Sequence, residues 1–264
     1  MNAPESLPLA DVQSIADRRN IYINRVGVKS LIHPLKVRSA DGGIVSTVAS
    51  VDMTVGLSAE LKGTHMSRFV EVLQQDAAVL DAASFGELLN RMLQRLEAAS
   101  GMIEMRFPYF ISKRAPVSGV ASLLDYKVVL RAEKTGAIAV FTTSVAAPAT
   151  SLCPCSKEIS EYGAHNQRSE ITITVQSDEP ILIEELAGIA EREASCEVYG
   201  LLKRPDEKYV TERAYDNPKF VEDLVRDIAL RLDADARVRL YTVEAENFES
   251  IHNHSAYALV ERGR

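Results

Sequence analysis

The 264-residue chain has the composition of an ordinary folded protein, with 46% apolar and 25% charged residues. A net charge of −7 and a pI of about 5.4 argue against broad nucleic-acid binding, yet a local cluster of cations can still hold a small anionic substrate. No window approaches the roughly 18 apolar residues that cross a bilayer, and the first twenty residues lack the order of a secretory signal. We therefore expect a cytoplasmic protein without membrane or nucleic-acid partners.

The first half of the chain alternates between strand and helix patterns after a polar stretch, residues 1–18, that we expect to be a loosely held arm. NIYINRVGVKSLIHPLKV and IVSTVASVDMTVGLSAEL are rich in β-branched residues and predict two long antiparallel strands. Apolar residues at three- and four-residue spacing then predict two helices. Thr64 can cap the first, which carries apolar residues from Met66 to Leu73, and Ser84 can cap the second, which carries them from Leu88 to Leu96. Strand patterns return in MIEMRFPYFIS and LDYKVVLRAE.

The second half repeats this order. GAIAVFTTSVAAPA and RSEITITVQ predict strands, ILIEELAGIAERE a helix, and NPKFVEDLVRDIALRLD a second helix with Asn217 as N-cap and Pro218 in its first turn. ARVRLYTVEAEN and SAYALVER predict the closing strands. We therefore expect two modules, 19–135 and 136–264, each with the order β-β-α-α-β-β, that pack helices on one face of an antiparallel sheet in an α+β fold.

The stretch TSLCPCSKEISEYGAHNQRS contains two of the three cysteines and one of five histidines. A thiolate from Cys153 and an imidazole from His165 suit zinc or a similar metal, and three cysteines with two crowded together make a poor disulfide framework. A bridge from Cys153 to Cys155 across one proline would be strained. C-x-C is nevertheless not the C-x-x-C of zinc knuckles, and an isolated cysteine also serves as a small buried apolar residue. His252 and His254 in SIHNHSAY are either ligands or hairpin-turn residues.

Long ordered motifs in this chain resemble the prokaryotic GTP cyclohydrolase I of type IB, from about residue 20 to the end. They are GTHMSR, SKRAPVSG, TSLCPCSKEIS with YGAHNQRSEITI, RPDEKYVTERAYDNPKFVED and FESIHNHSAYA. The resemblance implies a tunnelling fold, with most of the active site in the second module, and a homotetramer with active sites near subunit interfaces. It also implies conversion of GTP to 7,8-dihydroneopterin triphosphate and formate, the first step toward folate and 7-deazaguanine tRNA nucleosides.

The same resemblance implies a set of site residues. It places a divalent metal, zinc, manganese or iron, on Cys153, His165, Glu207 and His252. It makes Cys155 an active-site cysteine that contacts the nucleotide, and Glu222 the carboxylate that anchors guanine. From the residues alone, Glu207 in the charged loop PDEKY also reads as a surface glutamate. Glu222 likewise reads as an ordinary glutamate near a helix N-terminus.

Binding of a triphosphate requires cations, and four lie in the motif segments: Arg68, Lys113, Arg114 and Arg168. Each of them also suits a surface salt bridge. No G-x-x-x-x-G-K-[ST] loop is present, so the chain is not a P-loop enzyme. Two alternatives stay open: another tunnelling-fold pterin or deazapurine enzyme, and a non-catalytic scaffold closed by a structural metal. A zinc deaminase is disfavoured, because its H-x-E and P-C-x-x-C signature is absent.

Overall fold

The computed structural model describes residues 13, 15–76 and 79–263. Most of the predicted N-terminal arm, residues 1–12 and 14, lies outside this range. Its described part is paired with the rest of the chain, since Ala16 forms an antiparallel bridge with Leu61 and the Asp17 backbone N–H donates to the Glu60 carbonyl.

The helices and strands follow the predicted order, with three short or polar elements added in the second half. The first half contains β1 (Ile23–Arg38), β2 (Ile44–Leu57), α1 (Met66–Asp76), α2 (Ala82–Arg95), β3 (Ser100–Arg114) and β4 (Ala121–Thr135). The second half contains β5 (Ile138–Leu152), α3 (Pro154–Ile159), β6 (Asn166–Ser177), α4 (Ile183–Glu193), β7 (Cys196–Glu197), α5 (Arg204–Asp216), α6 (Val221–Asp233), β8 (Val238–Asn247) and β9 (Ala256–Gly263).

All of these strands belong to one antiparallel sheet with the order β1-β2-β3-β4-β5-β6-β8-β9. Strand β7 pairs with β5 at Ala149 and Thr150, beyond the stretch of β5 that pairs with β4. The predicted boundary between the modules falls in the turn from β4 to β5, where Gly136 has a φ of 59° that favours glycine. Within the described residues, β1 and β9 are the open edges of this sheet.

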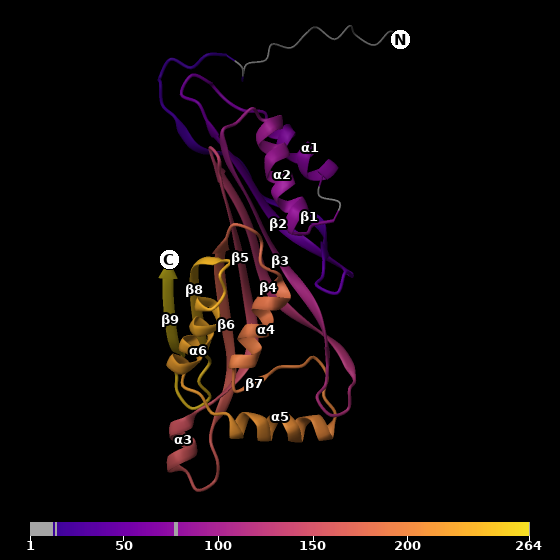
Figure 1. Ribbon diagram of the computed structural model, residues 1–264, viewed down its shortest axis with the longest axis vertical. Coiled ribbons are helices and arrows are strands. Elements are labelled where there is room, and N and C mark those ends of the chain that lie inside the picture. Colours follow the sequence, from indigo (N-terminus) through magenta and orange to yellow (C-terminus); the bar gives the residue numbers. More distant parts are fainter. Residues whose placement is uncertain (1–12, 14, 77–78, 264) are drawn as a thin grey trace.

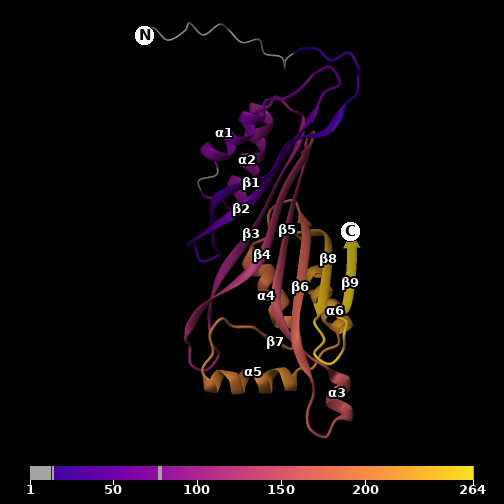
Figure 2. The ribbon, with the colours of Figure 1, turned by 180° about the vertical axis from the view of Figure 1, so that it is seen from behind.

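Helices α1, α2, α4 and α6 cover one face of the sheet, and the strands are uncovered when the molecule is seen from behind (Figures 1 and 2). Side chains alternate along each strand, as in β6, where every second residue is buried. The buried ones meet the apolar stripes of the helices in one continuous core that includes Ile103, Tyr109, Ile173, Leu224 and Val243. Helices α3 and α5 lie at one end of the sheet, and α1 lies toward the other end (Figure 1).

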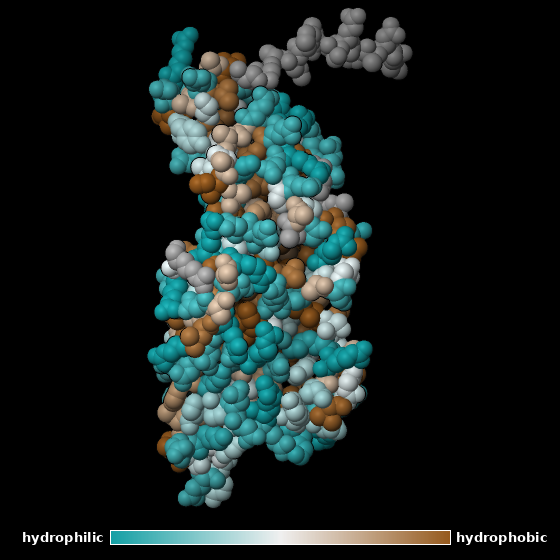
Figure 3. Space-filling model, in the orientation of Figure 1, coloured by the Kyte–Doolittle hydropathy of each residue, from teal (hydrophilic) through white to brown (hydrophobic). Residues whose placement is uncertain are grey.

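The outer surface of the helical layer is mainly hydrophilic, with separate hydrophobic patches (Figure 3). Among the described residues, no helix is both long and apolar enough to cross a membrane.

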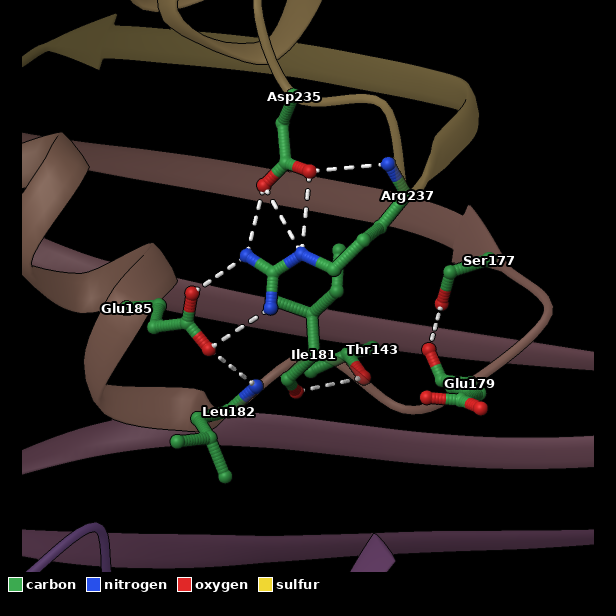
Figure 4. Close-up of polar contacts among 8 residues, drawn as sticks. All are labelled: Thr143, Ser177, Glu179, Ile181, Leu182, Glu185, Asp235 and Arg237. Atoms are coloured by element: carbon green, nitrogen blue, oxygen red, sulfur yellow. Dashed lines mark hydrogen bonds and ion pairs between the residues drawn. The ribbon is translucent and has the colours of Figure 1, made fainter.

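Arg237 fastens α4 to the turn between α6 and β8. Its guanidinium donates to both carboxylate oxygens of Glu185 on α4, with the shorter contact 2.6 Å, and to the Asp235 carboxylate (Figure 4). Glu185 also accepts the Leu182 backbone N–H, 3.3 Å away, so this carboxylate supports the first turn of its own helix. These contacts hold the second helical pair in place over β5, β6 and β8.

Two predicted helix caps are wrong. The N-cap of α2 is Asp81, not Ser84: the Asp81 carboxylate accepts the Ser84 backbone N–H, and the Ser84 hydroxyl accepts the Asp81 N–H in return. Asn217 ends α5 instead of starting α6, whose N-cap is Phe220. The Asn217 side chain donates to the Ala194 and Ser195 carbonyls, and this ties the end of α5 to the end of α4.

The prediction of a charged loop around Glu207 is also wrong, because residues 204–216 form helix α5. The sequence RPDEKYVTERAYD has few apolar residues and no continuous apolar stripe, so its periodicity gives no helix signal. Its buried side chains are only Asp206 and Ala214. The helix is held through polar contacts at its ends and through a small apolar cluster, in which Val210 and Ala214 meet Leu152 and Cys196.

Candidate active site

Cys153 and His165 face each other at the end of the β5–β6 ladder. The last regular pair of this ladder is Leu152 with Asn166, and the Cys153 backbone N–H donates to the His165 carbonyl at 3.2 Å one position further on. Residues directly opposite each other in an antiparallel ladder project their side chains to the same face. The chain between Cys153 and His165 therefore forms a loop that contains α3 and returns to the end of the ladder.

Ser156 joins the two residues locally. Its hydroxyl accepts the His165 backbone N–H at 3.3 Å and donates to the Cys153 carbonyl at 3.1 Å, while its backbone N–H points to the Cys153 sulfur at 3.5 Å. Cys153 is the N-cap of α3, and Pro154 follows in the first helical turn. Cys155 lies in the same turn and is exposed, so its thiol is open to solvent.

The His165 ring is largely buried and has two acceptors beside Nδ1. Gln167 Oε1 lies 2.9 Å from this nitrogen, and Glu249 Oε2 lies 3.7 Å from it. Gln167 sits two residues along β6 and Glu249 comes from the loop between β8 and β9. The sequence pattern did not single out either residue, although the two-residue period of a strand places Gln167 on the same face as His165.

Asp206 fixes the start of α5 against the loop between β3 and β4. Its carboxylate, with a fully buried side chain, accepts the backbone N–H groups of Val117, Ser118 and Lys203, each at 2.8 Å, and the Ser118 hydroxyl at 2.6 Å. Burial opposes ionisation, but the hydrogen bonds from Ser118 and the backbone outweigh it and hold the pKa of Asp206 well below its usual range. The neighbouring Glu207 is exposed and has no partner among the described side chains.

Replacement of Asp206 by asparagine is expected to lower the melting temperature at pH 7 by at least about 5 °C, because charge-assisted hydrogen bonds are lost. The folded-state pKa lies below the unfolded value of about 3.9, so the carboxylate stabilises the fold above that pH. The advantage of the unmodified protein over the variant should shrink as the pH falls below about 4. Thermal melts from pH 3 to 8, with the exposed Asp216→Asn as control, measure this; a constant difference contradicts it.

The described part of the chain contains no group of three or more His, Cys, Asp and Glu side chains placed to hold a metal ion. His252 and His254 are exposed in the β8–β9 loop and stack on each other, with their ring centroids 5.1 Å apart. The start of this loop is tied to β6, since the Phe248 N–H donates to the Arg168 carbonyl at 3.0 Å. The structure therefore brings Cys153 and His165 together but joins neither His252 nor Glu207 to them as a cluster.

Glu222 lies in the first turn of α6 and is exposed. Among the described residues it has no hydrogen-bond or ion-pair partner. The negative charge is favourable at a helix N-terminus, but no cation of the described residues pairs with it. Its carboxylate oxygens are free to accept hydrogen bonds from a ligand.

The four candidate phosphate ligands differ in availability. Arg168 on β6 is exposed and its guanidinium has no partner among the described side chains. The Arg114 guanidinium donates to the Gly119 carbonyl at 3.3 Å. Arg68 lies on α1, toward the opposite end of the molecule from α3 (Figures 1 and 2), and donates to the Arg95 carbonyl. Within one chain, Arg68 does not share a site with Cys153.

Lys113 is the least available of the four because its ammonium group is buried. It donates to Glu191 Oε1 at 2.7 Å and to the Val198 carbonyl at 3.0 Å, and it lies 4.6 Å from the centroid of the Tyr199 ring. The Tyr126 hydroxyl donates to the same Glu191 carboxylate. This arrangement binds β3 to α4 and uses the donors that a phosphate would need.

Replacement of Lys113 by methionine is expected to cost about 3 kcal/mol of unfolding free energy, because it leaves the buried Glu191 charge unpaired. The KM for a triphosphate substrate should stay within about threefold, since the ammonium is already engaged. Lys127→Met removes an exposed ion pair with Glu170 and should cost less than about 1 kcal/mol. A large rise in KM for Lys113→Met, with little loss of stability, would show that Lys113 binds phosphate.

An apolar cavity of about 360 Å³ lies away from these residues, between β1, α2 and α4. Its lining includes Leu80, Phe85, Leu130 and Ile183. None of the predicted site residues contributes to it, and Cys153 and His165 lie instead at the end of the sheet near α3.

The family model described as type I GTP cyclohydrolase folE2 matches residues 9–258 of this chain. A GTP cyclohydrolase FolE2 of Azoarcus sp. (strain BH72) is 57% identical over 265 residues and covers 100% of this chain and 98% of its own. A GTP cyclohydrolase FolE2 of Nitrosococcus oceani is 58% identical over 255 residues, with coverage of 97% and 96%. These relatives match the chain along its whole length.

Among solved structures, a uricase from Arthrobacter globiformis aligns with a TM-score of 0.51 and 7% sequence identity. The alignment covers 91% of this chain and 93% of the uricase. At this identity the likeness concerns the fold alone. It confirms the predicted tunnelling fold, an α+β architecture built on an antiparallel sheet.

Proposed function

The chain belongs to the type I GTP cyclohydrolase FolE2 family, and on that premise we propose that it converts GTP to 7,8-dihydroneopterin triphosphate and formate. The observation that carries the proposal is the 57% identity to a named GTP cyclohydrolase over the full chain. The opposed positions of Cys153 and His165 at the end of the β5–β6 ladder support it. The product serves as the precursor of folate and of 7-deazaguanine tRNA nucleosides, and the reaction is cytoplasmic.

The donor set of the proposed metal site fits a divalent ion chemically. Cys153 and His165 offer sulfur and nitrogen from one face of the ladder, while Glu207 and His252 offer an oxygen and a second nitrogen from exposed positions. Such a mixed set accepts zinc, manganese or iron. When bound, the ion supplies a water molecule whose pKa is lowered toward neutrality, which attack on C8 of guanine requires.

The other residues bind and orient the nucleotide. The free carboxylate of Glu222 accepts the two adjacent donors on the N1 and N2 edge of guanine. The Arg168 guanidinium, which has no partner among the described side chains, binds the triphosphate, with Arg114 beside the same end of the sheet as a second cation. The exposed Cys155 thiol contacts the purine, and whichever of His165 and His252 is not tied to the metal moves protons as the imidazole ring opens and formate leaves.

A homotetramer with active sites near subunit interfaces accounts for residues that one chain leaves apart. Glu207, His252 and Glu222 are exposed, and Arg68 lies toward the far end of the molecule, where it can serve the site of a neighbouring subunit. The open edge strands β1 and β9 offer unpaired backbone groups for such an assembly. Sedimentation of the purified protein tests the assembly directly.

Incubation of the purified full chain with GTP and with zinc, manganese or iron tests the activity. We expect formate and pterin in equal molar amounts, with the pterin measured by its fluorescence after oxidation. We expect no product from ATP. A second matched reaction in the presence of a chelator should be inactive with the protein still folded, as judged by its circular dichroism. Absence of formate with all three metals contradicts the proposal, and unfolding by the chelator would favour a structural metal.

A further inference from the structure

A chain of buried polar side chains leads from His165 into the sheet. The residues come in cross-strand pairs, Ser151 opposite Gln167 and Ser169 opposite Asn247. The Asn247 amide donates to the Ser151 hydroxyl at 3.1 Å and accepts from the Ser169 hydroxyl at 2.6 Å. All four side chains are less than a tenth exposed. Buried polar groups in such a network are held in fixed orientations, since each lost partner is costly.

The Gln167 amide connects this network to the His165 ring. Its Nε2 is turned toward the Ser151 hydroxyl, at 3.5 Å, and its Oε1 is turned toward His165 Nδ1, at 2.9 Å. The Glu249 carboxylate is a second acceptor, 3.7 Å from the same nitrogen, and an ionised carboxylate has no hydrogen to donate. Two acceptors therefore face Nδ1, so this nitrogen carries the hydrogen of the neutral ring.

We infer that Gln167 and Glu249 are positioning residues that hold His165 as the Nδ1–H tautomer, so that Nε2 presents the ring's lone pair to the active site. Nε2 itself has no hydrogen bond within the described part of the chain. The backbone of His165 is fixed as well, because its N–H donates to Ser156 and its carbonyl accepts from Cys153. The role of Nε2 in metal binding rests on the proposed function, whereas the assignment of the Nδ1–H tautomer does not.

The mechanism is that of an outer-shell partner on a metal ligand. A ligating imidazole usually donates its other ring N–H to a carboxylate or carbonyl, which fixes the tautomer and makes the ligating nitrogen more basic. Loss of such a partner typically lowers metal affinity by about 10- to 100-fold. Gln167 supplies one kind of partner from β6 and Glu249 the other from the β8–β9 loop, so the loop that bears His252 is coupled to His165 through Glu249.

The first test is direct observation of the ring hydrogens. The full-length protein is labelled with 15N-histidine and studied by magic-angle-spinning NMR, metal-free and with zinc added, and the His165 signals are assigned by their loss in His165→Gln. Protonated and unprotonated ring nitrogens have well-separated shifts. We expect Nδ1–H in both samples. An Nε2–H ring in the unmodified protein overturns the inference, whatever its effect on activity.

The second test separates positioning from general stability. Gln167→Leu combined with Glu249→Leu should populate the Nε2–H tautomer and weaken zinc binding, measured by chelator competition, by about 10- to 100-fold. Ser169→Ala removes a partner from the same network further from the ring, so it should lower the melting temperature and leave tautomer and zinc affinity unchanged. An unchanged tautomer in the double variant overturns the inference. An Nδ1–H ring in a protein that binds no metal upholds the tautomer and refutes the metal proposal.

Discussion

Replacement of Cys153 by alanine is expected to leave a folded protein that forms pterin at least about a thousandfold more slowly. A bound metal contributes several kcal/mol to attack by water, and each 1.4 kcal/mol is tenfold in rate. The fold should survive because Cys153 is only partly buried and Ser156 supports the same turn through its own hydroxyl. Loss of the sulfur acceptor at the N-cap of α3 costs about 1 kcal/mol.

Two variants make this prediction specific to the thiolate. Cys153→Ser gives α3 a better N-cap than the thiol does, so this variant should be at least as stable as the unmodified protein. It should nevertheless be as inactive as the alanine variant. Cys155→Ala changes the exposed neighbouring thiol and should retain the metal, measured by elemental analysis of the purified protein. Near-normal turnover by either Cys153 variant would remove this residue from the site.

The sequence predicted the layers of this fold because the apolar pattern of each strand and of most helices is a direct consequence of one buried face. The β6 segment alternates strictly, and the α6 stripe Val221, Leu224, Val225 and Ile228 recurs at helical spacing. The apolar pattern does not predict helix α5, because this helix buries only a small apolar patch and is anchored at its ends by Asp206 and Asn217. The local sequence also does not decide which residue caps α2, because the Asp81 and Ser84 side chains each accept the backbone N–H of the other residue.

The sequence predicts the proximity of Cys153 and His165 but not the residues that surround them. The spacing of Cys153 and His165 with the resemblance of their motifs predicted a pair, and the register of β5 with β6 brings the two residues opposite each other. The role of Lys113 could not be read from SKRAP, because its engagement with Glu191 depends on a helix 78 residues away in sequence. The sequence did not predict the role of Glu249 for the same reason, because its distance from His165 depends on how the β8–β9 loop folds back on β6.

Replacement of Glu222 by glutamine is expected to lower kcat/KM for GTP by about a hundredfold or more. A carboxylate accepts hydrogens from both N1 and N2 of guanine, whereas the amide keeps one acceptor and turns a donor toward the other hydrogen. Loss of one charge-assisted hydrogen bond and the new donor–donor contact together cost about 3 kcal/mol. Stability should change little, because Glu222 is exposed and has no partner among the described residues.

The choice of substrate shows whether this loss comes from guanine recognition. ITP lacks the N2 amino group, so the unmodified protein should prefer GTP strongly over ITP, and Glu222→Gln should lose most of that preference. Asp223→Asn makes the same charge change on the next residue, whose carboxylate pairs with Arg226 at 3.0 Å, and it should keep the preference. If Glu222→Gln instead slows GTP and ITP equally, the carboxylate acts on a part of the substrate that both nucleotides share, and guanine must be anchored by another residue.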